Sequence, residues 1–159
     1  MSASKSLSEL KAIRLKLKAE GKKVVFTNGV FDLIHAGHVD YLSKAKQLGD
    51  VLIVGLNSDD SVIRIKGNNR PILKQDERAF ILSNLKPVDY VIFFDEDTPE
   101  KLISEIIPDI LVKGGDWAVE KIVGREIVEK NGGKVMNIEF VNQQSTSKII
   151  ELIVKRYSK

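Results

Sequence analysis

Apolar and polar residues alternate along the chain in a pattern that predicts a succession of helices and short strands. The capping-box sequence Ser6–Glu9 opens a helix whose apolar residues recur at helical spacing until Gly21. The same reasoning predicts strands at 24–26, 51–56, 90–94, 110–112 and 134–140, and helices at 39–48, from 58 or 59, at 76–85, 98–107 and 122–130, and from 145 or 147 onward. Residues 27–29 are expected to form a turn.

Strands that are separated by helical segments are typical of a parallel sheet covered on both faces. The predicted fold class is therefore α/β, with one doubly wound, Rossmann-like domain and a sheet of about five parallel strands. The 159 residues show no repeat, low-complexity tract or linker, and we expect a single domain over 1–159, with an N-terminal helix in 1–21 and a core in 22–159.

Composition narrows the classes of function. The absence of cysteine excludes disulfides and thiolate metal sites, and the start of the chain lacks the pattern of a secretory signal. No apolar stretch is long enough to span a bilayer, so we expect a cytoplasmic protein with no membrane partner. The net charge of +3 comes from intermixed acidic and basic residues, without the basic stripe of a nucleic-acid binder.

Both histidines of the chain lie in the segment Gly29–His38, between the first strand and a helix. His35 and His38 share one helical face if the first turn has formed, and the helix N-terminus there favours a phosphate. Gly37 lets a triphosphate approach the backbone closely. Histidines that only cap or pack are the alternative, but a pair around a glycine in this position favours phosphate binding. No third ligand has the spacing of a metal site.

Four segments are poorly explained by packing, and each follows a strand or precedes a helix: 29–38, 65–74, 113–117 and 142–148. Ligands bind at the carboxyl ends of the strands in open parallel sheets, so these segments are expected to converge there. Within the second segment, Lys66 and Arg70 are candidates for a phosphate clamp. A solvated loop is the alternative, which we prefer for Lys74, and Arg78 is interpreted as a surface or ion-pair residue.

In the third segment the glycines permit close backbone approach, Trp117 is a candidate for stacking on a base, and Asp116 is a candidate hydrogen-bond acceptor. A tight turn with the tryptophan packed on the sheet edge is the alternative. Three hydroxyl residues at the start of the last helix suit both capping and phosphate binding: Ser145, Thr146 and Ser147. Asp32 suits either Mg²⁺ or a helix N-cap, and we favour a structural or orienting role for it.

The pattern Gly29-x-Phe31-Asp32-x-x-His35-x-Gly37-His38 resembles the nucleotide-binding motif of the cytidylyltransferase-like nucleotidyltransferases. That superfamily shares its HxGH element with class I aminoacyl-tRNA synthetases, but the chain is too short for a synthetase and lacks a KMSKS-like loop. Segments 57–60, 66–71, 96–99 and 112–117 resemble the adenylyltransferase domain of the ADP-heptose synthases, and 145–150 resembles the family's phosphate-binding Ser-Thr motif. One departure is Gln143-Gln144, where relatives often have glycine.

The resemblance covers nearly the whole chain from about residue 21 and implies a heptose 1-phosphate adenylyltransferase without the sugar kinase that many bacterial relatives carry. AMP would pass from ATP to D-glycero-β-D-manno-heptose 1-phosphate, giving ADP-heptose for lipopolysaccharide core biosynthesis. The implied catalytic residues are His35, His38 and Lys66. The implied ATP-binding residues are Asn28, Gly29, Phe31, Asp32, His35, Gly37, His38, Arg70, Gly114, Asp116, Trp117, Ser145, Thr146 and Ser147.

Mg²⁺ or Mn²⁺ is expected to enter with ATP, bound mainly through phosphates and with protein ligands unassigned. A homodimer is expected by resemblance. Two alternatives stay open at this point. One is a cytidylyltransferase acting on glycerol 3-phosphate or a similar alcohol phosphate, and the other is a nucleotide-binding module without catalysis. A role in nucleic-acid binding rests only on the pI near 9.0.

Overall fold

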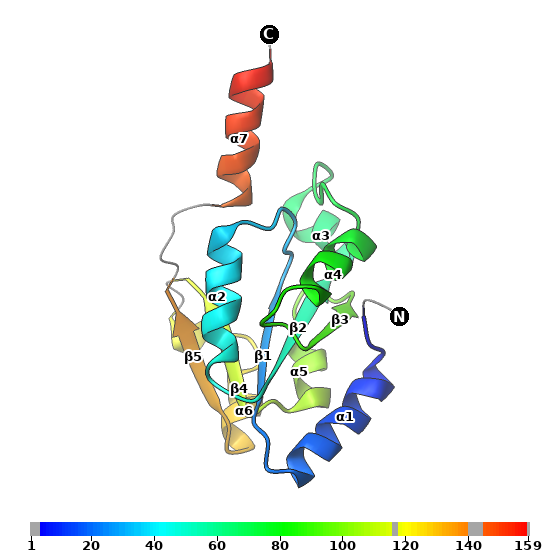
Figure 1. The fold of residues 1–159 in the computed structure, drawn as a ribbon, viewed down its shortest axis with the longest axis vertical. Helices are drawn as coiled ribbons and strands as arrows, with labels where there is room; N and C mark the ends of the chain where they lie inside the picture. Colours follow the sequence, from blue (N-terminus) through cyan, green and yellow to red (C-terminus); the bar gives the residue numbers. More distant parts are fainter. Residues whose placement is uncertain (1–3, 116–117, 140–144, 159) are drawn as a thin grey trace.

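The computed structural model describes residues 4–115, 118–139 and 145–158, and these contain one five-stranded sheet (Figure 1). Its strands are β1 (Val24–Gly29), β2 (Val51–Asn57), β3 (Tyr90–Phe94), β4 (Ile110–Gly114) and β5 (Lys134–Ile138). They lie in the order β3-β2-β1-β4-β5, and every neighbouring pair is parallel. The predicted α/β class and strand number are therefore confirmed.

The described helices are α1 (Leu7–Ala19), α2 (Ala36–Lys46), α3 (Asp59–Lys66), α4 (Gln75–Ser83), α5 (Glu100–Ile106), α6 (Arg125–Lys130) and α7 (Thr146–Tyr157), with a 3₁₀ turn at Val119–Lys121. Helices α1, α5 and α6 pack their buried apolar residues on one face of the sheet. Helices α2 and α4 cover the opposite face. Every residue of β2 is buried, as expected for a strand that is covered on both faces.

Local sequence signals explain how α1 is fixed to the sheet. The predicted capping box is present, because the Ser6 hydroxyl accepts the Glu9 N–H and the Glu9 carboxylate accepts the Ser6 N–H. Arg14 is buried and donates to the Ile107 carbonyl and to Asp109, both at 2.9 Å. The second oxygen of Asp109 accepts the backbone N–H of Val24, so one carboxylate joins α1 to the start of β1.

Several expectations about element boundaries are wrong, and the structure explains three of them. Residues 27–29 form the second half of β1 rather than a turn, because β2 is long enough to pair with β1 as far as Gly29. Helix α6 begins at Arg125 instead of 122, after a left-handed Gly124. Helix α5 ends at Ile106, and Ile107, the last residue of the predicted helix, is 37% exposed because it ends α5 in a left-handed conformation.

The last helix, α7, begins as expected with Ser145 as its N-cap. It extends away from the sheet beyond the start of α2 (Figure 1), and none of its residues is buried. Its exposed large apolar residues are Leu152, Ile153, Val154 and Tyr157. Phe140, the end of the last predicted strand, lies outside the described residues. Within the described part of the chain, no helix has the length and apolar character needed to cross a membrane.

Candidate functional site

A pocket of about 450 Å³ opens at the carboxyl ends of β1, β2 and β4. Residues from all four of the polar segments identified in the sequence contribute to it, so their predicted convergence is confirmed. The lining residues are Asn28, Gly29, Val30, Phe31, Asp32, His38, Tyr41, Asn57, Ile65, Lys66, Arg70, Asp97, Thr98, Pro99, Lys113, Gly114, Lys121, Ile122, Val123 and Thr146.

The turn after β1 is shaped by packing between Gly29 and Phe31. Phe31 has a positive φ of 44°, and its ring lies so close that a Cβ at Gly29 would come within 2.9 Å of it. The buried Phe31 ring in turn contacts the His38 ring, with 5.3 Å between centroids. A side chain at position 29 would therefore displace the Phe31 ring that contacts His38.

The two histidines lie together at the start of α2. His35 is the N-cap residue and His38 lies in the first turn, and their rings stack with 3.9 Å between centroids. The predicted common face is thus confirmed, although only His38 is among the residues that line the pocket. In both rings, Nδ1 is buried and has no hydrogen-bond partner within the described ranges.

Both imidazoles are neutral near neutral pH. Burial lowers the pKa of His38 to about 4, and the neighbouring His35 acts in the same direction, while the Leu33 carbonyl opposes the shift. Burial also lowers the pKa of His35. A neutral imidazole has one N–H donor and one acceptor nitrogen. The pair can therefore donate hydrogen bonds to a ligand without carrying a permanent charge.

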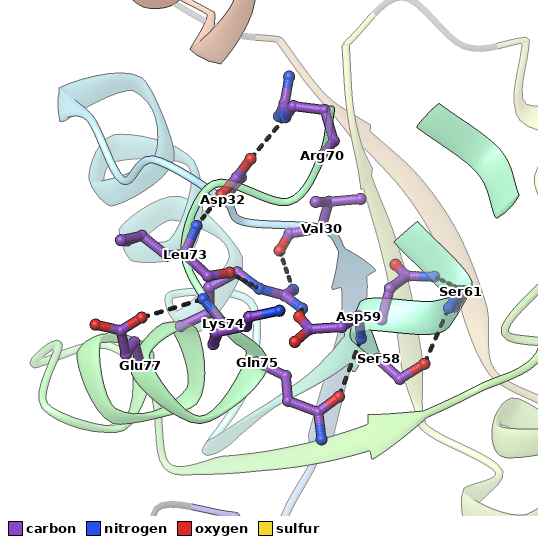
Figure 2. Close-up of polar contacts among 12 residues, drawn as sticks. Val30, Asp32, Ser58, Asp59, Ser61, Arg70, Leu73, Lys74, Gln75 and Glu77 are labelled. Atoms are coloured by element: carbon purple, nitrogen blue, oxygen red, sulfur yellow. Dashed lines mark hydrogen bonds and ion pairs between the residues drawn. The ribbon is translucent and has the colours of Figure 1, made fainter. Parts of the chain in front are cut away.

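Asp32 organises the neighbouring loop rather than capping α2, so the N-cap hypothesis is wrong. Its buried carboxylate accepts from Arg70 Nε at 2.6 Å and from the backbone N–H of Leu73 at 3.0 Å (Figure 2). It also accepts from the backbone N–H of Ile72 at 2.9 Å. Burial raises the pKa of Asp32, but these backbone N–H groups and Arg70 outweigh burial and hold the pKa below its ordinary value. The contacts support the orienting role that we favoured.

Arg78 is completely buried and bonds to three segments around the pocket. It donates to Asp59 Oδ1 at 2.8 Å, to the Val30 carbonyl at 2.7 Å and to the Leu73 carbonyl at 3.0 Å. The predicted ion pair is present, but the surface location is wrong. Its position one helical turn before the buried Leu82 was the available signal that it faces inward.

The other candidates in this region are divided between the pocket and the surface. Lys66, at the end of α3, and Arg70 both line the pocket, as predicted. Lys74 is exposed, and its backbone N–H bonds to Glu77 at the start of α4, which agrees with the solvated interpretation. Gly37 is buried in α2 and is not among the lining residues, so a direct approach of a ligand to it stays a prediction.

The start of α7 adds a second helix N-terminus to the pocket. Ser145 accepts the Lys148 N–H at 3.2 Å as a capping bond. Thr146 lines the pocket and donates to the Leu33 carbonyl at 3.4 Å, which brings α7 beside the turn before α2. Ser147 is exposed and outside the pocket lining. Unpaired N–H groups at helix starts favour anions, so two such ends at one pocket suit a phosphate-rich ligand.

Sequence reasoning gave no individual role to several lining residues, of which Asn57 and Lys113 are the most informative, although both lie in segments that it singled out. Each is a polar residue at the carboxyl end of an otherwise apolar strand, and that pattern was the signal available to find them. Gly114 lines the pocket as predicted. Asp116 and Trp117 lie outside the described residues, so their predicted contacts with the base and sugar stay predictions.

Comparisons with known proteins place this geometry in context. A family model described as cytidylyltransferase-like matches residues 26–152. The bifunctional protein HldE of Citrifermentans bemidjiense is 60% identical over 87% of this chain, and that of Geobacter sulfurreducens is 54% identical over 96%. The chain spans only 28% and 31% of those two relatives.

Two solved structures share the fold. The lipopolysaccharide core biosynthesis protein from Thermoplasma volcanium has a TM-score of 0.63 and 33% identity, and the match covers 78% of this chain and all of that one. A pantoate-beta-alanine ligase from Francisella tularensis has a TM-score of 0.62, with 98% of this chain and 77% of that one covered. Its identity is only 17%, so this second likeness concerns the fold alone.

Proposed function

Because the chain belongs to the cytidylyltransferase-like family and is thus a nucleotidyltransferase, we propose that it transfers AMP from ATP to D-glycero-β-D-manno-heptose 1-phosphate. The products would be ADP-heptose and pyrophosphate. The relatives named HldE and the lipopolysaccharide core biosynthesis protein support this choice of acceptor. Residues 1–159 would act as one catalytic unit in the cytoplasm, where ATP is available.

One observation carries the proposal. The N-termini of α2 and α7 meet at a pocket that also contains Lys66 and Arg70. Two helix ends and two cations supply many N–H donors and positive charge, which is what a triphosphate beside a sugar phosphate requires. The acids that line the same pocket are Asp32, whose charge is already paired with Arg70, and the exposed Asp97.

The proposed reaction is an in-line attack by an oxygen of the sugar phosphate on the α-phosphorus of ATP. A phosphate monoester, with a second pKa of about 6, is largely ionised at neutral pH and needs no general base. The protein therefore aligns the two phosphates and stabilises the charge that develops on the α-phosphate and the leaving pyrophosphate. His38 would donate from its neutral ring to those oxygens, with His35 stacked behind it.

Mg²⁺ would enter as part of the ATP complex. In the described portion of the chain, no group of three or more His, Cys, Asp or Glu side chains is arranged to hold a metal ion. Asp32, the acid considered for this role, uses its oxygens to hold Arg70 and the loop after it. These side chains do not fit a metal site made of protein ligands alone, so the phosphates would supply most of the ligands.

The test is pyrophosphate release by purified protein with Mg²⁺, in which ATP and CTP are crossed with heptose 1-phosphate, glycerol 3-phosphate and no acceptor. Release only with ATP and heptose 1-phosphate is the expected result. Release with CTP would support the cytidylyltransferase alternative. Absence of release under every condition, together with ATP binding, would support the non-catalytic module instead.

A homodimer is part of the proposal. Helix α7 supports it, because its apolar residues Leu152, Ile153 and Val154 are each about half exposed in the single chain. Sedimentation equilibrium measures the mass directly, and a value twice that of the 17.8 kDa chain is expected. A mass equal to one chain at every concentration would contradict a dimer.

A further inference from the structure

Lys113 places a positive charge in the lining of the pocket. It is the fourth residue of β4, directly after Ile110, Leu111 and Val112, all of which are buried. The lysine itself is half-buried and lines the pocket. A strand inside the sheet thus ends with an ammonium group at the edge where ligands bind in this type of fold.

The ammonium group of Lys113 has only a weak hydrogen-bond partner among the described residues. Its best described partner is the amide oxygen of Asn28, at 3.4 Å, which is long for a hydrogen bond. No salt bridge of Lys113 occurs among the described residues, whereas the nearby Arg70 and Arg78 each have a carboxylate. Burial lowers the pKa of Lys113, and the positive charge of Lys66 lowers it further.

Two cations that repel one another across a pocket are stabilised by an anion that both can contact. Lys66 reaches the pocket from the end of α3, and Lys113 reaches it from the end of β4. A phosphate between them would replace repulsion with two attractions and would give Lys113 the charged acceptor that it lacks. Lysine binds phosphate as a point charge and can use up to three N–H donors.

We propose that Lys113 and Lys66 together form a subsite for one phosphate group of the substrates. The inference rests on the proposed function, which brings two sources of phosphate to this pocket, ATP and the acceptor. In either case Lys113 contacts the substrate directly and is not merely a structural residue at the strand end. Lys113→Met removes the charge while keeping a long, unbranched side chain, and Lys113→Gln provides a second neutral variant.

Binding should be measured by calorimetry without turnover, with α,β-methylene-ATP plus Mg²⁺ in one series and heptose 1-phosphate in the other. We expect one of the two Kd values to rise about 10- to 100-fold in Lys113→Met, the range for a lost hydrogen bond between charged groups. Weaker binding of the ATP analogue would assign the subsite to ATP, and weaker binding of the sugar phosphate would assign it to the acceptor. Combining Lys113→Met with Lys66→Met should give a non-additive loss, since both contact one phosphate.

Lys134→Met is the matched control, because Lys134 is exposed at the opposite end of the neighbouring strand β5. It should leave both Kd values unchanged. The melting temperature of ligand-free Lys113→Met should equal or exceed that of the wild type, because a repelled, half-buried charge has been removed. Unchanged Kd values in both neutral variants, with or without a lower melting temperature, would overturn the subsite. A wild type that binds ligand but releases no pyrophosphate would contradict the proposed function instead.

Discussion

Two groups of polar residues at and beside the pocket differ in how far the protein itself satisfies them. In the first group, which we call the arginine cluster, each charged side chain has a partner within the protein: Asp32, Asp59, Arg70 and Arg78. In the second group, which we call the histidine–lysine cluster, polar atoms have weak partners or none among the described residues: Asn28, His35, His38 and Lys113. Members of both clusters line one cavity, yet only the first cluster is complete without a ligand.

The difference indicates that the arginine cluster is a structural frame for the pocket, whereas the histidine–lysine cluster is a binding surface. A buried polar group that lacks a partner lowers stability, so proteins keep such groups mainly where a ligand will supply the partner. The arginine cluster links the turn after β1, the start of α3 and the loop before α4 (Figure 2). Breaking it should therefore affect folding first, whereas changes in the histidine–lysine cluster should affect binding and turnover first.

The largest effect is expected from Arg78→Met, which breaks the arginine cluster at its centre. The change leaves Asp59 without its cation and leaves the carbonyls of Val30 and Leu73 without their donor. Removal of one partner of a buried ion pair lowers the free energy of unfolding by about 3–5 kcal/mol. Urea denaturation measures this loss.

Arg125→Met is the matched control for Arg78, because Arg125 pairs with Glu129 one turn along the surface helix α6. Exposed pairs of this kind contribute about 0.3–0.5 kcal/mol. Equal losses in the two variants would mean that the buried contacts of Arg78 contribute nothing beyond an ordinary surface pair, and the arginine cluster would not be a frame.

The histidines test the histidine–lysine cluster. His38→Ala and His35→Ala should each lower kcat more than they raise KM, because hydrogen bonds to phosphate strengthen as charge develops in the transition state. Loss of one such donor typically costs about 10²–10³-fold in kcat. Since only His38 lines the pocket, its replacement should have the larger effect. Pyrophosphate release measures both constants, and wild-type turnover in both variants would exclude the proposed role.

Asp32→Asn is expected to have an intermediate effect, because it weakens the arginine cluster without removing its centre. An amide cannot accept as strongly from Arg70 and two backbone N–H groups, and its own NH₂ would face some of these donors. The free energy of unfolding should fall by about 1.5–3 kcal/mol, the range for hydrogen bonds to a charged group. KM for ATP should rise as Arg70 loses its fixed position. An unchanged KM would mean that Arg70 does not need this anchor.

The fold was predictable because its signals are local. Apolar runs bounded by polar residues located all five strands, and the capping sequence at Ser6–Glu9 located the first helix. Predicted boundaries were wrong where pairing with another strand sets the end of an element. Residues 27–29 are an example, because pairing with β2 extends β1 through them. The predicted end of the helix at Ile107 was wrong for a related reason, since the left-handed turn that ends α5 leaves this residue partly exposed to solvent.

The pocket lining was predictable at His38, Lys66 and Arg70, because the sequence motifs lie where the strands of a parallel sheet end, and the roles of these residues stay predictions. The contacts within the arginine cluster were not predictable. The bonds of Arg78 to Val30 and Asp59 connect positions 48 and 19 residues apart, and no spacing rule relates them. Asp32 was ambiguous for the same reason, since its partners lie in a loop about 40 residues away.

The smallest expected effect is the dependence of folding stability on pH. Its measurement compares the two clusters within one experiment. The pKa of His38 is about 4 in the folded protein and about 6.5 in a free side chain, so between these values the unfolded state binds more protons. Stability should therefore fall as pH drops from 6.5 towards 4, by an amount on the order of 1 kcal/mol once solvent screening of the partly exposed ring is allowed for. Asp32 changes stability in the same direction but at lower pH, because its pKa is also lowered and the stability that its ionised carboxylate adds is lost only as pH falls below the ordinary value of 3.8.

His38→Gln should flatten this decline between pH 6.5 and 4, measured as the free energy of unfolding in urea at several pH values. Carboxylates elsewhere titrate equally in both proteins, so the difference between the two curves isolates the histidine. Saturating α,β-methylene-ATP should flatten the wild-type curve as well, because a phosphate beside the ring favours its protonated form. If the wild-type and variant curves run parallel, the neutral state of His38 does not arise from its folded surroundings, and the contrast between the clusters loses its electrostatic basis.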